Sequence, residues 1–422
     1  MSVDKILDPL LGPSDKGFPQ QAPALPRSQI GAQGWSVIDG DLPLPLAVIR
    51  QRELAHNLGW MQRFCDERGI ALAPHGKTTM SPQLFRRQLD AGAWGLTLAT
   101  VGQARVAIEA GARNILIANQ VLAEADLRSI EWLKRRHADL RLLFLVDSAA
   151  QVALIEALQP DTAFEVLVEV GVPGGRTGCR TRDDALALAR RVKASPALAL
   201  AGIECYEGLG AQAGDAQDRQ YADALMQRFT EVVLSADRER LFERDQIVLS
   251  AGGSAIFDLV VPGLKPQLAR PVLGLLRSGC YVTHDQGNYT RLVSLVNRRI
   301  GCDDTQGLQP AMELWATVQS LPEPGLAILA AGKRDISYDL GMPIPLQWLR
   351  RGSRALQPVP SDWRIPGMND QHAYLRGTLG DLAVGDRVVL GLSHPCTTFD
   401  KWRWMPVVDE GYRVVDAIVT CF

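Results

Sequence analysis

The chain has 422 residues, of which 46% are hydrophobic and 22% are charged, and its formal net charge is -2. These values are typical of a folded globular protein, and they exclude a basic protein that binds nucleic acid or an anionic membrane surface. No apolar run approaches the ~20 residues that a membrane-spanning helix requires. The first residues show no secretory signal, and the seven cysteines are irregularly spaced, so we expect a cytoplasmic protein without a disulfide framework.

Eight short apolar runs alternate with amphipathic stretches between about Leu46 and Asp285. Each run has the length of a strand and lacks strict alternation, as expected for strands that are buried on both faces. The runs are residues 71–74, 94–99, 114–118, 141–146, 164–170, 199–205, 246–251 and 272–276. This count predicts an α/β fold, a (β/α)₈ barrel over residues 45–285.

The pattern changes after about Gly287, where β-rich segments are separated by glycine, proline and aspartate. Residues 408–412 have the composition of a hairpin turn. We therefore expect a C-terminal antiparallel β domain over residues 286–422. The first 44 residues either join this domain or run over the surface, and the sequence leaves both possibilities open.

Lys77 follows the first predicted strand and is flanked by His75 and Thr78. Functional groups of such barrels lie at the C-terminal ends of the strands. A lysine that reacts with a carbonyl cofactor needs a desolvated site and a fixed direction, which a strand end provides. Position alone, however, also describes a lysine that is solvated in a loop.

Residues Gly252, Gly253 and Ser254 lie between the seventh predicted strand and a probable helix. A glycine pair lets backbone N–H groups approach an anion, and the start of the helix adds a favourable dipole. Barrels often bind phosphate after strands seven and eight. A tight turn between strand and helix explains the same residues equally well.

His394 and Cys396 follow a strand-like run at residues 386–393. In an extended segment, residues two apart point to the same side, and both side chains suit zinc. Two protein ligands are fewer than the three usual at catalytic zinc, so water, substrate or another residue must complete the site. Without further context, a His-x-Cys pair is more often structural.

Residues 74–78, Pro-His-Gly-Lys-Thr, resemble the cofactor-lysine region of the D-serine dehydratase and D-threonine aldolase family, which comprises alanine-racemase-like enzymes that use pyridoxal 5'-phosphate (PLP). The resemblance is collinear from about residue 45 to the C-terminus. Further matching segments are Ser81-Pro82, residues 88–93, 98–100 and 168–171, Arg176-Thr177-Gly178, Tyr206-Glu207-Gly208, Gly252-Gly253-Ser254, residues 277–282 with Asp285, and His394-Pro395-Cys396.

The chain departs from the family pattern in three places. Thr79-Met80 stands where the family usually has His-Lys, and Gly208-Leu209 where it often has Gly-His. Residues 370–373, Asp-Gln-His-Ala, stand where it often has Glu-Glu-His-Gly. These positions can shape the substrate pocket.

The resemblance implies that Lys77 holds PLP covalently and later takes the Cα proton of the substrate as a general base. Tyr281 and the backbone of residues 252–254 would anchor the phosphate. Arg176 and Tyr206 would lie along the cofactor ring. His75 would pack against the cofactor or, alternatively, only satisfy a neighbouring backbone group.

By the same resemblance, His394 and Cys396 would bind zinc or another divalent metal, which stabilises a departing 3-hydroxyl. Family aldolases tend to carry His and Asp at this pair, and dehydratases carry His and Cys. We therefore expect a D-serine dehydratase, or a related deaminase of D-3-hydroxy amino acids, that yields a 2-oxo acid and ammonia. The alternatives are a metal-dependent D-threonine aldolase and a non-catalytic PLP-binding protein.

A racemase is less expected, because no tyrosine of the β domain stands in a context suited to the second base. The expected ligand is a small D-amino acid, with no nucleic acid or membrane partner. The resemblance also implies a homodimer in which the β domain of one subunit meets the barrel of the other.

Overall fold

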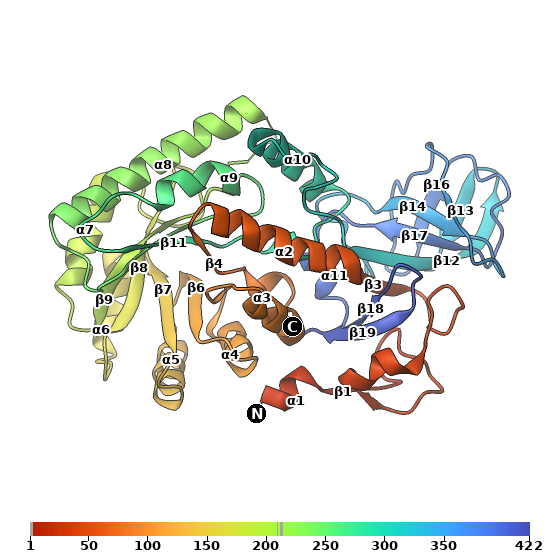
Figure 1. Ribbon diagram of the computed structural model, residues 1–422, viewed down its shortest axis with the longest axis horizontal. Helices are drawn as coiled ribbons and strands as arrows, with labels where there is room; N and C mark the ends of the chain where they lie inside the picture. Colours follow the sequence, from red (N-terminus) through yellow and green to blue (C-terminus); the bar gives the residue numbers. More distant parts are fainter. Residues whose placement is uncertain (1–2, 209, 212–213) are drawn as a thin grey trace.

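The computed structural model describes residues 3–208, 210–211 and 214–422, which form a barrel and a β domain side by side. Figure 1 shows the barrel strands with their helices on one side and the C-terminal strands on the other. The two parts meet at the end of the barrel from which the functional residues project. The described fold is therefore the predicted barrel with a C-terminal, mostly antiparallel β domain.

Eight parallel strands form the barrel sheet in the order β4-β11-β10-β9-β8-β7-β6-β5. The edge strands β4 and β5 meet at a parallel bridge between His75 and Thr97, which closes the ring. All eight predicted runs are strands, and the (β/α)₈ prediction is confirmed. Their bounds are β4 Ala71–Leu72, β5 Leu96–Leu98, β6 Asn114–Gln120, β7 Arg141–Val146, β8 Phe164–Val170, β9 Leu198–Cys205, β10 Ile247–Ala251 and β11 Val272–Leu276.

The barrel interior is a packed core of small and branched side chains contributed by successive strands. Leu143 and Leu145 are two apart on β7 and both point inward, as the period of a strand requires. A filled interior leaves room for a ligand only at the mouth. The members of this cluster are Ala73, Leu116, Leu143, Leu145, Leu167, Ala201, Val248 and Leu275.

Helices cover the outside of the barrel, and four of them begin at a serine or threonine whose side chain accepts the hydrogen bond of a backbone N–H. These capping residues are Ser81, Thr100, Ser148 and Thr181. Pro82 at the first helical position adds a pre-set dihedral angle. The helices are α2 Gln51–Glu67, α3 Pro82–Asp90, α4 Val101–Glu109, α5 Glu124–Arg136, α6 Ala149–Ala157, α7 Arg182–Lys193, α8 Asp215–Arg238, α9 Phe257–Val260 and α10 Asn288–Ile300.

A nine-stranded sheet forms the β domain, with the main order β15-β14-β17-β12-β3-β18-β19, with β13 paired to β12 and with β16 paired to β13. The helix α11, Cys396–Phe399, lies between β17 and β18. The strands are β12 Met312–Glu323, β13 Leu326–Leu329, β14 Ile344–Leu349, β15 Leu356–Pro358, β16 Ala373–Arg376, β17 Arg387–Gly391, β18 Trp404–Val408 and β19 Val414–Val419.

The strand β3, Leu46–Arg50, belongs to the sheet of the β domain although it falls inside the predicted barrel range 45–285. It pairs antiparallel with β12 and parallel with β18. Four successive apolar residues before Arg50 indicate a buried strand but not its partners, because pairing depends on contacts that are distant in the sequence. The chain thus contributes one strand to the β domain before it enters the barrel.

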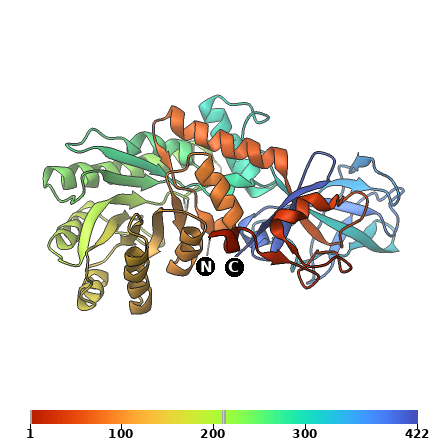
Figure 2. The same cartoon turned by 60° about the horizontal axis from the view of Figure 1, so that its bottom comes forward.

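The N-terminal segment packs against the β domain. Ser36 forms an antiparallel bridge with Arg413, and Arg27 forms an ion pair of 2.5 Å with Asp416 on β19. The segment contains α1 Val3–Leu7, β1 Leu10–Leu11, β2 Leu25–Pro26 and the 3₁₀ helix η1 Arg27–Gln33. Figure 2 shows it beside the β domain, with both chain ends near the junction with the barrel.

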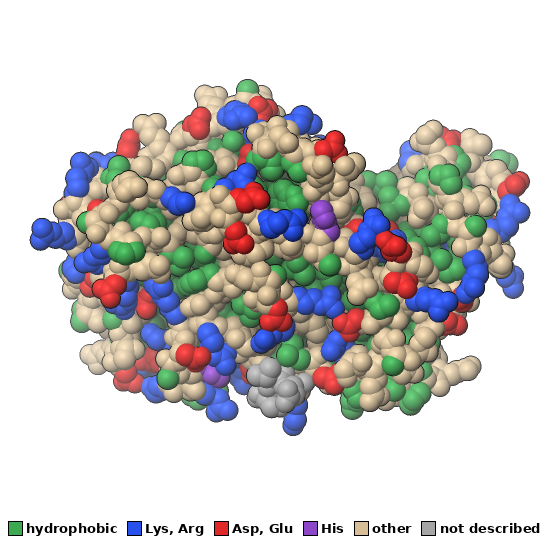
Figure 3. All heavy atoms as spheres, viewed as in Figure 1, with side chains coloured by type: hydrophobic (Ala, Val, Ile, Leu, Met, Phe, Trp, Pro, Cys, Tyr) green, Lys and Arg blue, Asp and Glu red, His purple; other side chains and the backbone are tan. Residues whose placement is uncertain are grey.

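Positive and negative side chains are interspersed on the face of the molecule in Figure 3. The described helices include none with the length and apolar character needed to cross a membrane.

Candidate active site

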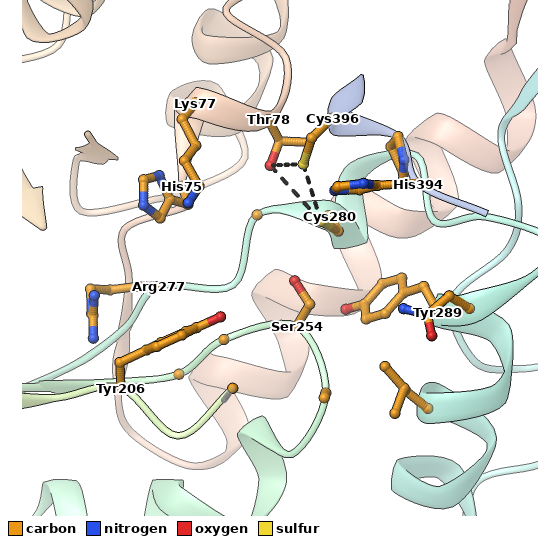
Figure 4. A pocket seen from close by; sticks show the side chains of 18 of the residues that line it. His75, Lys77, Thr78, Tyr206, Ser254, Arg277, Cys280, Tyr289, His394 and Cys396 are labelled. Carbon is orange, nitrogen blue, oxygen red and sulfur yellow. Dashed lines mark hydrogen bonds between the residues drawn. The ribbon is translucent and has the colours of Figure 1, made fainter. Parts of the chain in front are cut away.

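A cavity of about 560 Å³ opens at the mouth of the barrel, where it meets the β domain (Figure 4). Segments that follow β4, β8, β9, β10 and β11 line the barrel side, and the segment between β17 and α11 lines the other side. Nearly all of the predicted site residues line this cavity: His75, Lys77, Arg176, Tyr206, Gly252, Gly253, Ser254, His394 and Cys396.

Tyr281 is the predicted site residue that does not line the cavity. It lies in the short 3₁₀ helix η4, Cys280–Val282, and only 1% of its surface is exposed. Its hydroxyl accepts a hydrogen bond of 3.2 Å from the Gln88 amide. Burial raises the pKa of Tyr281. The adjacent Cys280 lines the cavity in its place.

Lys77 lies in a single 3₁₀ turn, η2 Gly76–Thr78, directly after β4. Gly76 packs so closely that an added Cβ would come within 2.7 Å of the Phe85 ring and 2.9 Å of Leu98. This contact fixes the turn against the barrel. The Lys77 side chain is exposed and extends over the cavity near His75 (Figure 4), and no carboxylate among the described residues pairs with it.

His75 is held neutral by its surroundings. Burial, followed by the nearby Lys77, keeps the pKa of the His75 imidazole well below its usual range. The backbone of Thr97, with which residue 75 forms a parallel bridge, opposes this lowering of the pKa. The Nδ1 atom of His75 is buried without a hydrogen-bond partner among the described residues. One ring nitrogen thus remains available to a ligand in the cavity.

The glycine loop after β10 follows the cavity wall, but a protein carboxylate already contacts part of it. Glu207 accepts a hydrogen bond of 2.9 Å from the Gly252 N–H and a second one from the Gly253 N–H. Gly252 has φ +107°, and an added Cβ would lie 2.3 Å from Leu276. Two of the N–H groups that were predicted to anchor a phosphate are therefore occupied by a protein carboxylate, and the part of the loop that remains for a phosphate begins at Ser254.

Two arginines line the cavity, one of them exposed and the other buried. The Arg176 guanidinium lies 5.1 Å from the centroid of the Tyr206 ring, on an exposed loop after β8. Arg277, at the end of β11, is buried and forms an ion pair of 2.6 Å with Glu204. Burial raises the pKa of Glu204 to about 8, although Arg277 opposes the shift. The Arg277 guanidinium is thus already paired with Glu204 inside the barrel before a ligand binds.

His394 and Cys396 face the cavity from the β domain, but the segment is not extended as predicted. Pro395 has helical dihedral angles and precedes α11, which begins at Cys396. Proline suits the start of a helix, and this explains the difference. The Nδ1 atom of His394 lies 2.5 Å from Asp339 Oδ2. The two side chains still line one cavity.

Three side chains meet where η2, η4 and α11 approach one another (Figure 4). The Cys396 sulfur lies 3.4 Å from the Thr78 hydroxyl and 3.8 Å from the Cys280 sulfur. Hydrogen bonding from Cys396 lowers the pKa of Cys280 to about 6, while the pKa of Cys396 is raised. Cys280 was visible in the sequence only as part of a matching segment.

Comparison with known proteins extends over both parts of the fold. The sequence model of the alanine racemase N-terminal domain matches residues 49–273, and that of a putative serine dehydratase domain matches residues 311–408. The chain is 30% identical over 375 residues to D-threo-3-hydroxyaspartate dehydratase of Delftia sp. (strain HT23), covering 85% of this chain and 92% of that enzyme. The chain belongs to the D-serine dehydratase and D-threonine aldolase family.

Other family members catalyse related reactions. The chain is 28% identical over 376 residues to D-threonine aldolase of Arthrobacter sp., covering 87% of this chain and 89% of that enzyme. The crystal structure of D-threonine aldolase from Filomicrobium marinum superposes with a TM-score of 0.76 at 23% identity, over 92% of this chain and 97% of that one. Consistent with these relatives, the chain is a PLP-dependent lyase that acts on D-amino acids.

Solved structures of D-threo-3-hydroxyaspartate dehydratase include two alanine variants, of a histidine and of a cysteine two positions further along. They superpose with TM-scores of 0.73 and 0.69 at 24% and 25% identity, over 92% of this chain and 97% and 99% of theirs. The structure of the cysteine variant is described as metal-free.

The family cofactor fits the barrel side of the cavity. Lys77 offers an amine without a carboxylate partner among the described residues, and His75 offers a buried nitrogen without a hydrogen bond. An added Cβ at Gly253 would come within 2.9 Å of the Tyr206 ring, so the loop and this ring enclose a narrow space. These features accommodate a flat ring with an aldehyde and a phosphate.

On the opposite side of the cavity, two side chains are suited to bind a metal ion, the imidazole of His394 and the thiol of Cys396. Nitrogen and sulfur ligands suit zinc and related ions. Within the part of the chain that the structure describes, no three His, Cys, Asp or Glu side chains gather closely enough to hold a metal by themselves. The protein would therefore supply two ligands and leave the remaining positions open.

Proposed function

We propose that this enzyme is a PLP- and metal-dependent dehydratase of a D-3-hydroxy amino acid with an uncharged side chain, with D-serine as the first candidate. The observation that carries the proposal is the pair His394 and Cys396 at the cavity. The same spacing of histidine and cysteine occurs in the variants of D-threo-3-hydroxyaspartate dehydratase, and the structure of the cysteine variant is of a metal-free form. The family resemblance links a cysteine at this position with dehydration.

In this proposal the Cα proton is removed on the barrel wall, which is formed by the cavity-lining segments after β4, β8, β9, β10 and β11. Bound PLP supplies an electron sink that stabilises negative charge at the substrate Cα. Lys77 holds the cofactor, and its free amine then takes the Cα proton as a general base. His75, kept neutral by burial, packs beside Lys77 without competing for that proton. Removal of the 3-hydroxyl leaves an enamine, which hydrolyses after release to a 2-oxo acid and ammonia.

In this proposal the departure of the 3-hydroxyl is assisted on the domain wall, which is formed by residues 393–396 of the β domain with Asp339. His394 and Cys396 would hold a divalent metal, which supplies Lewis acidity toward a substrate oxygen. Thr78, which contacts the Cys396 sulfur, links this wall to the turn that carries Lys77. The two halves of the reaction are thus assigned to side chains from two domains.

The charges around the cavity support a substrate without a second carboxylate. Its cationic lining residues are Lys77, Arg176 and Arg277. Arg277 is paired with Glu204, and Arg176 lies over Tyr206, which is on the side away from His394 in Figure 4. Among the described residues that line the cavity from the β domain, namely Leu340, Ser393, His394, Pro395 and Cys396, there is no lysine or arginine. A substrate carboxylate beside the metal would lack a partner there.

The test compares products from D-serine, D-threonine and D-threo-3-hydroxyaspartate with the PLP-loaded enzyme. We expect pyruvate and ammonia from D-serine, no glycine or aldehyde, and loss of turnover in His394→Ala and Cys396→Ala. Lys5→Ala, near the N-terminus, is the matched control. Glycine and acetaldehyde from D-threonine would instead favour an aldolase like the Arthrobacter relative. Preferred turnover of D-threo-3-hydroxyaspartate would contradict the proposed uncharged side chain.

The homodimer and the cytoplasmic location remain part of the proposal. A sedimentation measurement of the PLP-loaded enzyme would distinguish a dimer from a monomer of 46.1 kDa.

A further inference from the structure

Asp339 lies in the segment between β13 and β14, and both of its carboxylate oxygens contact the segment that contains Cys396. Its Oδ2 atom is 2.5 Å from Nδ1 of His394. Its Oδ1 atom accepts a hydrogen bond of 2.8 Å from the Thr397 hydroxyl. The carboxylate therefore binds the residues on either side of Pro395 and Cys396 at once.

These contacts determine which nitrogen of His394 can bind a metal. Because a carboxylate only accepts hydrogen bonds, Nδ1 of His394 must carry the hydrogen in this contact. Nε2 is then the nitrogen left with a lone pair for coordination. A histidine ligand with a fixed tautomer and ring direction binds its metal more tightly than one that is free to rotate.

We propose that Asp339 is the positioning residue for His394: it holds the imidazole so that Nε2 is directed to the metal beside Cys396, and Thr397 holds Asp339 in place. The inference rests on the proposed function, because it concerns the metal pair assigned there. It adds a residue from a different segment of the β domain, 55 positions before His394 in the chain.

A purely structural role explains the contact poorly. The side chains of His394 and Asp339 are 24% and 41% exposed, and exposed ion pairs contribute little to stability. Another aspartate of the same segment, Asp335, shows the contrast. It is 1% exposed, pairs with Lys16 at 2.6 Å and thereby attaches the N-terminal segment to the β domain. Asp335 fits a structural role, whereas Asp339 contacts His394, which lines the cavity.

The experiment measures the zinc affinity of the PLP-loaded enzyme by equilibrium dialysis against chelator-buffered zinc. Asp339→Leu removes the acceptor, and we expect a loss of affinity of about 10- to 100-fold. Asp339→Asn keeps an oxygen that can accept from Nδ1, so we expect it to recover most of the affinity. The control Asp381→Leu removes an aspartate whose side chain is 87% exposed, and it should leave zinc affinity unchanged. Melting temperature and the visible band of the cofactor should remain the same in all variants.

Two outcomes would overturn the inference alone. Zinc affinity in Asp339→Leu equal to that of the unmodified enzyme would show that His394 needs no orienting carboxylate. Equal, severe losses in Asp339→Asn and Asp339→Leu would indicate that the carboxylate binds the metal directly. Zinc affinity that is unchanged in His394→Ala would contradict the metal site of the proposed function, and this inference with it.

Discussion

The two walls of the cavity are built differently. The barrel wall consists of the segments after β4, β8, β9, β10 and β11. Lys77 and Arg176 are exposed, but other polar groups of this wall are buried and paired with fixed partners. Arg277 and Glu204, 4% and 1% exposed, exemplify them. The domain wall consists of residues 393–396 with Asp339, and its central contact, between His394 and Asp339, is partly exposed.

This difference separates stability from function. Removing one partner of a buried pair leaves an unsatisfied polar group in the protein interior, so the paired groups of the barrel wall cannot be altered without destabilising the fold. Contacts of exposed side chains contribute little to folding, so the domain wall can be altered while the protein remains folded. We therefore expect mutations in the two walls to give different combinations of lost activity and lost stability.

The largest effect on turnover should come from Lys77→Ala. Although Lys77 belongs to the barrel wall, we expect this variant to lose activity without losing stability. The variant loses both the attachment of PLP and the general base, so we expect turnover to fall by at least ~10³-fold. The exposed side chain makes no ion pair with the described residues, so the melting temperature of the PLP-free protein should not change. Pyruvate release and the visible cofactor band provide the measurements. Lys333→Ala is the control, and residual turnover within tenfold of the unmodified enzyme would contradict the assignment.

Arg277→Met should have the largest effect on stability. It leaves Glu204 buried without its partner, and an unsatisfied buried polar group costs about 1–3 kcal/mol, and more if it is charged. Chemical denaturation of the PLP-free protein measures the change. Arg350→Met removes an arginine whose partner, Asp381, is 87% exposed, and this variant should change stability by less than ~1 kcal/mol. Similar values for the two variants would remove the distinction between buried and exposed pairs.

Asp285, which follows β11 in the barrel wall, should make the free energy of unfolding depend on pH. Burial raises the pKa of Asp285 to about 7, above the ~3.9 of an unfolded aspartate. Between these values the folded carboxyl keeps a proton that the unfolded one releases. Its contribution to the free energy of unfolding therefore falls by up to ~1.4 kcal/mol per pH unit as the pH rises, and it is constant above about pH 7.

Asp285→Asn should remove this dependence while keeping an oxygen for the backbone N–H groups of Gly287 and Tyr289, which both bind Oδ1. Unfolding free energies of both proteins at pH 5, 6, 7 and 8 provide the test. We expect the advantage of the variant to grow from pH 5 to pH 7 and then remain level. An advantage that is independent of pH would show that Asp285 is already ionised at pH 5.

The smallest effect should come from Thr397→Val in the domain wall. The variant loses one exposed hydrogen bond to Asp339, so we expect a change in stability of less than ~1 kcal/mol. Zinc affinity should nevertheless fall a few-fold, because Asp339 is held less firmly. Dialysis against buffered zinc measures the affinity, with Thr305→Val in an exposed turn as the control. Unchanged affinity would show that Asp339 orients His394 without help from Thr397.

Much of the fold could be predicted because buried parallel strands are mostly apolar runs, such as residues 141–146 and 164–170. The sheet to which residues 46–50 belong could not be predicted. Their pattern is the same whether the strand pairs within the barrel or with β12 and β18, and only contacts more than 250 residues away along the chain decide between them.

The candidate site shows the same limit. Lys77, the glycine loop and the His-x-Cys pair lie in short local motifs that the sequence displays directly. Glu207 and Asp339 reach their partners over 45 and 55 positions, so no local pattern reveals their contacts. A local signal was available for one incorrect detail, since Pro395 before Cys396 indicates the start of a helix rather than an extended segment.

The placement of β3 has a consequence for the order in which the chain can fold during synthesis. This strand leaves the ribosome before any residue of the barrel, yet its partners on β12 and β18 are made only after the barrel is complete. Residues 46–50 must remain unpaired throughout that interval, because domains generally fold from the N-terminal end as they emerge. A fragment ending before β12 would expose this apolar strand. The β domain expressed alone would have a gap between β12 and β18, so neither part can be separated cleanly from the other.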